Sequence, residues 1–504
     1  MLACLRTAAV FGIDAQPVQV EVDVSFGMPT FTMVGLPDAS VRESRDRVRS
    51  AIRNSGFEFP PHRVTVNLAP ADVRKAGAAF DLPIALGILA AQGIVERRDI
   101  ADVMILGELS LDGAIQPARG VLPIAAGARR ESIPRVLLPR ANAAEAAVVA
   151  GITVLPVSSL TDAVSALNDP SRFLSMPPIV SLVPSAACNV PDLADVRGQL
   201  LPRRALELAA AGAHNLLLIG PPGAGKTMMA RRLPGILPPL TFDEALAVTA
   251  VHSVAGRLPP GVALLTERPF RAPHHTISTI ALIGGGSQPR PGEVSLAHHG
   301  VLFLDEMPEF SRHVLEVLRQ PLEEGRVAIA RAARTAIFPA RVVLVGAMNP
   351  CPCGHAGDPS RECRCTPVQI ERYRSRLSGP LRDRLDLTVE VPAVPPDVLA
   401  GAPAGESSGL VRARVVAARD RQRDRFGADG PRSNAELTPS LLREHCRLDP
   451  ASLALLRTAV ERLGLSARAY DRIRKVARTI ADLEGEADIR VAHVAEALQF
   501  RVAA

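Results

Sequence analysis

The stretch LLLIGPPGAGKT, residues 216–227, decides the class of fold. Four apolar residues precede a glycine-rich turn and a Lys-Thr pair, the order of a buried strand, a phosphate loop and a helix start. Residues 220–227 match G-x-x-x-x-G-K-[ST] at every fixed position. In such a loop, backbone N–H groups hold phosphates, the lysine reaches the β- and γ-phosphates, and the threonine ligates Mg²⁺. The predicted ATP-binding residues are Gly220, Pro221, Pro222, Gly223, Ala224, Gly225, Lys226 and Thr227.

The stretch GVLFLDE, residues 300–306, supplies the second half of a nucleotide site. Asp305 follows an apolar strand and is predicted to hold Mg²⁺, while Glu306 can polarise the attacking water. Hydrolysis requires such a residue, whereas nucleotide binding does not. The two motifs together predict an ATPase with ATP and Mg²⁺ as cofactors.

Composition limits the classes of protein to consider. A chain of 504 residues suits two to four domains. Only three of its 58 basic residues are lysines, Lys75, Lys226 and Lys475, which singles out the lysine of the phosphate loop. A net charge of +6 permits a polyanionic partner without establishing one. The apolar runs contain charges and the N-terminus is a poor export signal, so we expect no membrane span and a cytoplasmic location.

Hydrophobic periodicity predicts an α/β chain with three structured regions. Residues 18–26 alternate as a half-buried strand, further strands are expected within 62–70 and 102–115, and helices at 38–54 and 81–92. Short apolar runs in the middle of the chain are typical of a largely parallel sheet buried on both faces. The predicted organisation is an N-terminal α/β domain (1–169), a linker (170–197), an ATPase core (198–392), a second linker (393–409) and a helical lid (410–504).

Further landmarks resemble those of AAA+ ATPases. AMNP places Asn349 where the sensor-1 residue of that class orients water. SGPLRDRLDL, residues 378–387, resembles the arginine-finger segment, with Arg384 the best match and Arg382 next. LSARAYDRIRKVARTIADL, residues 465–483, resembles the sensor-2 helix of the lid, with Arg468 as its arginine. The resemblance implies catalytic roles for Glu306, Asn349, Arg384 and Arg468.

A more specific resemblance lies in residues 271–325, which run from RAPHHTISTIALIGGG through PGEVSLAHHGVLFLDEMPEF to VLRQPLEEG. This segment resembles the magnesium-chelatase-like AAA+ group. With the N-terminal domain and MNPCPCGH (348–355), the chain resembles the YifB/ComM family nearly end to end. The resemblance implies a homohexameric ATPase that acts on DNA as a branch-migration helicase in natural transformation.

The N-terminal region resembles the proteolytic domain of Lon, without its catalytic pair. Residues 73–89 resemble the segment that carries the serine of Lon, and GELSLDGAIQPARGVLPIAAGARR resembles the segment that carries its lysine. Aligned on the glycines, Ala79 stands at the nucleophile position and Ile124 at the lysine position. Neither side chain can act as nucleophile or base. We therefore expect a role in assembly or substrate docking; the role of the nearby Lys75 stays open.

Two clusters suggest metal chemistry. The pairs His274-His275 and His298-His299 lack a metal spacing signature, and we interpret them as structural residues of the insert. Cys351-x-Cys353 and Cys363-x-Cys365 offer four thiolates for a structural Zn²⁺ ion, with reduced cysteines or a redox pair as alternatives.

A predicted hairpin links the nucleotide site to DNA. RVAIA and TAIF indicate two short strands joined by RAAR, and in related AAA+ helicases a hairpin before sensor 1 grips nucleic acid. Arg331 and Arg334 are then predicted to contact phosphates of branched or single-stranded DNA without sequence preference. Two alternatives stay open: a chelatase motor subunit that drives metal insertion with partner subunits, and a protein-remodelling ATPase without peptidase activity.

Overall fold

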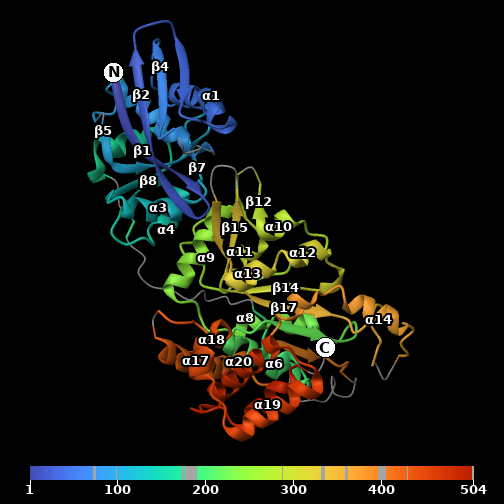
Figure 1. Ribbon diagram of the computed structural model, residues 1–504. Helices are drawn as coiled ribbons and strands as arrows, with labels where there is room; N and C mark the ends of the chain where they lie inside the picture. Colours follow the sequence, from blue (N-terminus) through green and yellow to red (C-terminus); the bar gives the residue numbers. More distant parts are fainter. Residues whose placement is uncertain are drawn as a thin grey trace.

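The computed structural model describes residues 1–71, 75, 77–97, 99–172, 176–177, 190–286, 288–330, 335–357, 361–394, 405–427 and 429–501. Figure 1 shows an N-terminal α/β domain, a central α/β core and a C-terminal helical region in succession. This arrangement confirms the predicted fold class. Among the described helices, none is long and apolar enough to cross a bilayer.

The N-terminal domain is built on a seven-stranded sheet of order β3-β4-β2-β1-β5-β8-β9. In β1, Leu5 faces one apolar cluster and Ala8 the other, because successive side chains of a strand point to opposite faces. The first cluster lies under α1 (Ala39–Asn54), α2 (Asp81–Ala91) and α5 (Leu160–Asn168), and the second under α3 (Val121–Arg130). The strands are β1 (Leu2–Phe11), β2 (Asp14–Ser25), β3 (Thr30–Val34), β4 (Arg63–Ala69), β5 (Asp99–Ile105), β8 (Arg135–Pro139) and β9 (Thr153–Val157).

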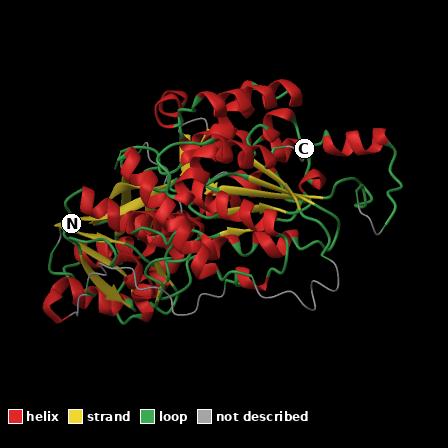
Figure 2. Cartoon of the chain, turned by 90° about the horizontal axis from the view of Figure 1, so that it is seen from below, coloured by secondary structure: helices red, strands yellow, loops and turns green. Residues whose placement is uncertain are grey.

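The central core contains a five-stranded sheet of order β11-β14-β17-β10-β18, in which every neighbouring pair is parallel. Leu216 and Leu218 of β10 enter one apolar cluster, and Leu217 and Ile219 enter the other. The sheet is therefore buried on both faces, as predicted from its apolar runs. Figure 2 shows its strands as a group enclosed by helices. The strands are β10 (Leu216–Ile219), β11 (Phe270–Arg271), β14 (Val301–Leu304), β17 (Val343–Met348) and β18 (Leu387–Glu390).

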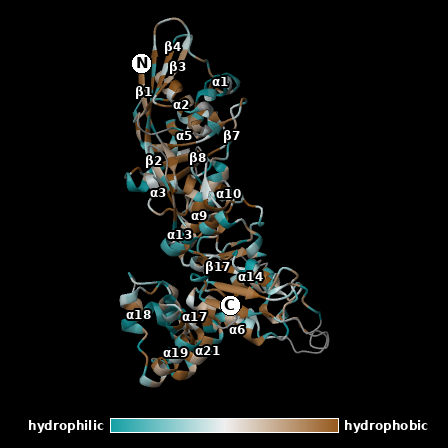
Figure 3. Cartoon of the chain, turned by 45° about the vertical axis from the view of Figure 1, so that its right-hand side comes forward, coloured by the Kyte–Doolittle hydropathy of each residue, from teal (hydrophilic) through white to brown (hydrophobic). Residues whose placement is uncertain are grey.

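The C-terminal helices cover one face of this sheet together with α6 (Leu200–Gly212). Ile473 and Val476 of α20 share a buried cluster with Leu216 and Leu218. Figure 3 shows the apolar strand β17 inside, with more hydrophilic helices around it. Thr438, Asp449 and Ser466 cap helix N-termini, and Gly464 and Gly485 cap C-termini, as these residue types commonly do. The helices are α17 (Ser408–Phe426), α18 (Pro439–His445), α19 (Pro450–Leu463), α20 (Ala467–Glu484) and α21 (Val491–Gln499).

The N-terminal domain packs directly on the core through α9 (Phe242–Ala255). Ala245 of α9 belongs to the same buried cluster as Ile124 of α3. Ser253 of α9 donates a hydrogen bond to the buried carboxylate of Glu145. The two regions are therefore joined by a buried interface that includes an apolar cluster and a hydrogen-bonded carboxylate.

Shorter elements complete the core and the N-terminal domain. They are β6 (Glu108–Leu109), β7 (Ile115–Gln116), α4 (Ala143–Ala146), α7 (Lys226–Ala230), α8 (Leu233–Ile236), α10 (Thr279–Ile283), β12 (Gly284–Gly285), β13 (Arg290–Pro291), α11 (Glu293–Leu296), α12 (Arg312–Glu316), α13 (Arg319–Glu324), β15 (Arg326–Ala330), β16 (Thr335–Pro339), α14 (Pro367–Arg374) and α15 (Gly379–Arg382).

Candidate nucleotide site

The carboxyl ends of three adjacent strands bring the nucleotide motifs together. The phosphate loop follows β10, Asp305 follows β14 and Asn349 follows β17. Because β17 lies between β14 and β10 in a parallel sheet, the three ends meet at one edge. Figure 1 shows this sheet in the middle of the molecule.

Lys226 lies at the centre of this edge. Its Nζ atom donates to the carbonyl oxygens of Gly220 (2.6 Å) and Pro221 (2.9 Å) and to Oδ1 of Asn349 (3.1 Å). The pKa of Lys226 is lowered by burial, an effect that the nearby carboxylates of Asp305 and Glu306 oppose. The structure therefore joins the predicted phosphate-loop lysine to the predicted sensor-1 residue.

The phosphate loop has the backbone that a phosphate cradle requires. Gly223 (φ +78°) and Gly225 (φ +89°) are in the left-handed region, and within the described part of the chain no atom lies within 4 Å of a Cβ placed on Gly223. Gly220 packs so closely that its Cβ would lie 2.1 Å from the carbonyl oxygen of Val391. The helix after the loop, α7, ends at Ala230. The next short helix, α8, begins at Leu233 and has Pro234 in its first turn, where the N–H that proline lacks would have no partner within the helix.

Thr227 and Asp305 form the second contact of the site. Oγ1 of Thr227 donates to Oδ2 of Asp305 over 2.7 Å, so the two predicted Mg²⁺ ligands lie side by side. A hydroxyl and a carboxylate are oxygen ligands of the kind that Mg²⁺ prefers. These residues therefore fit the ion that the ATPase prediction requires.

Glu306 has an unusual backbone and an exposed side chain. Its φ is +49°, a region that non-glycine residues seldom occupy and that is frequent at functional sites. Its Oε2 atom lies 3.8 Å from Nδ1 of His275. Sequence reasoning treated His275 as a structural residue and missed this pair. The two side chains come together because His275 follows β11, Glu306 follows β14, and these two strands are neighbours in the sheet.

The other histidine pair lies in a different place. His298 is buried and His299 is partly buried, and their pKa values are lowered to about 2 and about 3 by desolvation and by neighbouring cationic side chains. They line a cavity of about 680 Å³ with Ile13 of the N-terminal domain and Arg432 of the C-terminal region. Among the residues that the structure describes, the histidines contribute to no cluster of three or more metal-ligating side chains.

The predicted arginines of the site lie apart from the phosphate loop. Arg384 is paired with Glu323 and donates to the carbonyl oxygen of Pro380 over 2.8 Å. Its side chain is only 12% exposed, whereas Arg382 is exposed. Arg468 is 64% exposed and lies 3.6 Å from Asp383. Within the described chain, Arg384 and Arg468 thus pair with acidic residues near the end of the core and not with the nucleotide motifs.

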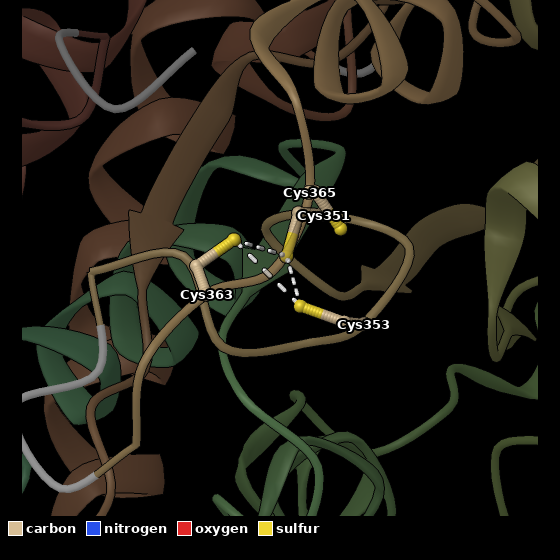
Figure 4. A group of neighbouring side chains, drawn as sticks. All are labelled: Cys351, Cys353, Cys363 and Cys365. Carbon is tan, nitrogen blue, oxygen red and sulfur yellow. Dashed lines mark hydrogen bonds between the residues drawn. The ribbon is translucent and has the colours of Figure 1, made fainter.

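The four cysteines predicted to bind zinc lie close together. All four Sγ atoms are within 4.8 Å of one another (Figure 4). The pKa of Cys353 is lowered to about 6, because backbone N–H groups of His355 and Arg364 and the Cys351 side chain hydrogen-bond to its sulfur. This geometry is suited to a metal ion such as Zn²⁺.

The predicted hairpin before sensor 1 is present. Strands β15 and β16 pair antiparallel, from Arg326 opposite Pro339 to Ala330 opposite Thr335. Arg331 and Arg334, the predicted DNA contacts, lie outside the described residues. The hairpin packs near the N-terminal domain, since a Cβ on Gly12 would lie 3.3 Å from the carbonyl oxygen of Ile337.

The N-terminal domain carries no Ser-Lys pair at the positions aligned with Lon. Ala79 lies in a single 3-10 turn, and Ile124 of α3 is 2% exposed. Lys75 is fully buried and donates to the carbonyl oxygen of Pro70. The position aligned with the catalytic lysine therefore serves as apolar packing beside the core.

Comparisons with known proteins agree with these observations. The family described as "Magnesium chelatase, subunit ChlI" matches residues 192–399, "Subunit ChlI of Mg-chelatase" matches 20–142, and "Magnesium chelatase, subunit ChlI C-terminal" matches 405–501. The chain is 46% identical over 504 residues to competence protein ComM of Haemophilus influenzae, covering 99% of this chain and 97% of that protein. It is 44% identical over 501 residues to YifB of Escherichia coli, with the same coverage. A shorter similarity to Lon protease of Chloroflexus aurantiacus, 33% over 159 residues, covers 29% of this chain and 19% of that protein.

Proposed function

The chain belongs to the YifB/ComM family of magnesium-chelatase-like AAA+ ATPases, and on this basis we propose that it is an ATP-driven ring motor that acts on DNA. The specific activity proposed is branch migration during homologous recombination or natural transformation. The relative from Haemophilus influenzae is named a competence protein and aligns over nearly the whole of both chains. Its name supports a DNA-processing role for this chain.

The proposed chemistry follows from the edge of the central sheet. Backbone N–H groups of residues 220–227 and Nζ of Lys226 would bind the phosphates of ATP. Thr227 and Asp305 would hold Mg²⁺, which neutralises charge that develops on the phosphates. Glu306 would polarise the attacking water, and Asn349 would orient it. Arg384 of a neighbouring subunit and Arg468 would stabilise charge on the transferring group after assembly into a homohexamer.

The observation that carries the DNA proposal is the position of hairpin β15–β16. The hairpin ends at Pro339, and β17 begins four residues later and leads straight to Asn349. A shift at Asn349 on hydrolysis can therefore be transmitted along one strand to the hairpin. Arg331 and Arg334 at its tip would contact phosphates, which gives sequence-independent and salt-sensitive binding.

A second candidate function is a chelatase motor. The three matching families are all described by the ChlI subunit of magnesium chelatase. In that case ATP hydrolysis would drive metal insertion with partner subunits. Protein remodelling without peptidase activity is a third candidate, consistent with the absence of a Ser-Lys pair at Ala79 and Ile124.

A branch-migration assay with hairpin variants tests the DNA proposal. Replacing Arg331 and Arg334 together with alanine should leave basal ATP hydrolysis and assembly unchanged, weaken DNA binding and flatten its salt dependence, because phosphate contacts are lost. A matched control is the double change of Arg457 and Arg462 to alanine, which removes two exposed arginines of α19. If the hairpin variant migrates branched DNA as fast as wild type, the hairpin does not grip DNA.

A further inference from the structure

The four-cysteine cluster has the dimensions of a metal site. Sγ of Cys351 lies 3.3 Å from Sγ of Cys353, and each lies 3.7 Å from Sγ of Cys363. Cys365 completes the group, with all four sulfurs within 4.8 Å (Figure 4). Zn–S bonds of about 2.3 Å in a regular tetrahedron place sulfur atoms about 3.8 Å apart. The observed separations are close to this spacing.

The same separations do not fit disulfides. A disulfide holds its sulfurs about 2 Å apart and joins them in pairs. Here one sulfur, that of Cys363, is equally distant from two others. The convergence of four sulfurs on one point favours a single ion with four ligands over a redox pair.

The surroundings of the cluster also suit thiolate ligands. The backbone N–H of Ala356 donates to Sγ of Cys351 over 3.3 Å. Hydrogen bonds of this kind stabilise a sulfur that carries negative charge. The second cysteine pair is followed at once by Thr366, which caps α14 with Gln369. One end of the cluster is therefore held by a buried strand and the other by a capped helix.

The cysteine loop packs on the nucleotide site. Gly354, between the two pairs, has φ +84°, and a Cβ on it would lie 2.6 Å from Cδ of Pro222 in the phosphate loop. The same Cβ would lie 3.9 Å from Cγ of Asn349, the residue that accepts a hydrogen bond from Lys226. The loop thus contacts the phosphate loop and lies beside the predicted sensor residue.

We propose that Cys351, Cys353, Cys363 and Cys365 bind one structural Zn²⁺ ion, which holds the loop around Gly354 against Pro222 and thereby fixes the geometry of the nucleotide site. The metal site stands independently of the proposed function, and the effect on ATP rests on the nucleotide site described above. The ion takes no part in hydrolysis. Its role is to hold Asn349 and the phosphate loop in fixed positions relative to each other.

The first test is metal analysis of the purified full-length protein. We expect about one zinc per chain, and Co²⁺ substitution should give the intense visible bands of a tetrahedral thiolate site. Cys363→Ser should lose the metal, and Cys363→His should retain it because imidazole is also a zinc ligand. Cys4→Ser, in β1 of the N-terminal domain, is the control and should leave the metal content unchanged. Zinc no higher in wild type than in the variant with all four cysteines changed to serine overturns the metal site.

The second test separates the metal from its effect on ATP. Gly354→Ala keeps every cysteine but pushes the loop away from Pro222, so we expect full zinc content and ATP binding about tenfold weaker. Gly357→Ala introduces a side chain at a similar φ of +80°, with no atom of the described residues within 4 Å of the new Cβ, and should bind ATP normally. Equal ATP affinity in the Gly354 and Gly357 variants overturns the coupling. Wild-type protein that holds zinc but binds no ATP would contradict the proposed function and leave the metal site in place.

Discussion

The central core and the N-terminal domain differ in the side chains they place at the positions of their sequence motifs. In the core, Nζ of Lys226 donates to Oδ1 of Asn349 over 3.1 Å, and Oγ1 of Thr227 donates to Oδ2 of Asp305 over 2.7 Å. In the N-terminal domain, the position aligned with a catalytic lysine is the buried Ile124. The core brings polar groups together at a sheet edge, and the N-terminal domain has a packed apolar side chain at the aligned position.

The difference teaches that one region presents polar groups at a sheet edge, whereas the other uses a helix face for contact between domains. At the edge of the central sheet, the phosphate-loop motif contains glycines with positive φ, and the exposed Glu306 also has a positive φ. In the N-terminal domain, α3, which carries Ile124, shares a buried cluster with α9 of the core, and Ser253 of α9 hydrogen-bonds to Glu145. The N-terminal domain is thus suited to docking.

The largest expected effect concerns the core. Lys226→Ala should abolish ATP binding, because no other lysine lies in the phosphate loop, whereas Glu306→Gln should bind ATP without hydrolysing it. Calorimetric ATP titration and phosphate release measure the two steps separately. Equal ATP affinity for wild type and Lys226→Ala would contradict the contrast between the two regions, because the phosphate loop of the core would then not be the ATP-binding site.

The next effect concerns the neighbouring subunit. Arg384→Ala should leave ATP binding intact and slow turnover on the order of 10³-fold in assembled rings, as expected for an arginine finger. Mixing this variant with Glu306→Gln should restore some activity. At an interface between the two variants, the intact Glu306 of one subunit can meet the intact Arg384 of its neighbour. Glu323→Gln, which removes the partner of Arg384, should stay active as a control.

Arg382 provides the contrasting outcome. It is exposed, while Arg384 is largely covered within its own subunit. If Arg382→Ala is rescued by mixing and Arg384→Ala is not, the finger is Arg382.

A third prediction returns a lysine to the N-terminal domain. Ile124→Lys should destabilise the protein by about 3 kcal/mol or more, because an unpaired charge enters an apolar cluster. Ile124→Val should cost only about 1 kcal/mol, and Ala79→Ser should change stability little. Differential scanning calorimetry measures these shifts. A stable Ala79→Ser/Ile124→Lys variant that cleaves peptides would show that the catalytic face is still open.

A smaller expected effect is a difference between the two regions in how their stability depends on pH. The pKa values of His298 and His299 are lowered to about 2 and about 3, so these side chains stay neutral when the core is folded and gain protons on unfolding below about pH 6.5. The free energy of unfolding of the core therefore decreases as the pH falls below about 6.5. Each of the two histidines contributes up to about 1.4 kcal/mol per pH unit to this decrease. In the N-terminal domain, burial raises the pKa values of Asp81 and Glu145. These carboxyl groups bind protons more readily when folded, so acid does not destabilise the domain through them.

The measurement is the melting temperature from about pH 7.5 to about pH 5.5. The transition of the core should move down, and His298→Asn should reduce that shift. Asparagine does not titrate, and its amide oxygen can accept the backbone N–H of Arg341 that now binds Nδ1 of His298. An equal shift in wild type and variant would assign the acid sensitivity to other groups.

Local sequence signals predicted much of this structure. The phosphate loop, the strand before Asp305, the hairpin strands and the helix caps at Thr438, Asp449 and Ser466 were predictable, because each depends on residues close in sequence. The contact between His275 and Glu306 was not, since it requires knowing that β11 lies beside β14. The burial of Ile124 beside α9 likewise depends on how two domains pack. The cysteine spacing indicated a metal site, but only the structure shows that its loop lies against Pro222.

The most direct test of the central claim is the rate of ATP hydrolysis by assembled rings with and without DNA. We predict that branched or single-stranded DNA raises the rate, that the increase declines with salt, and that the variant lacking Arg331 and Arg334 keeps the basal rate but loses the increase. A rate that is the same without DNA and with duplex, single-stranded or branched DNA would contradict a DNA motor and favour the chelatase-like alternative.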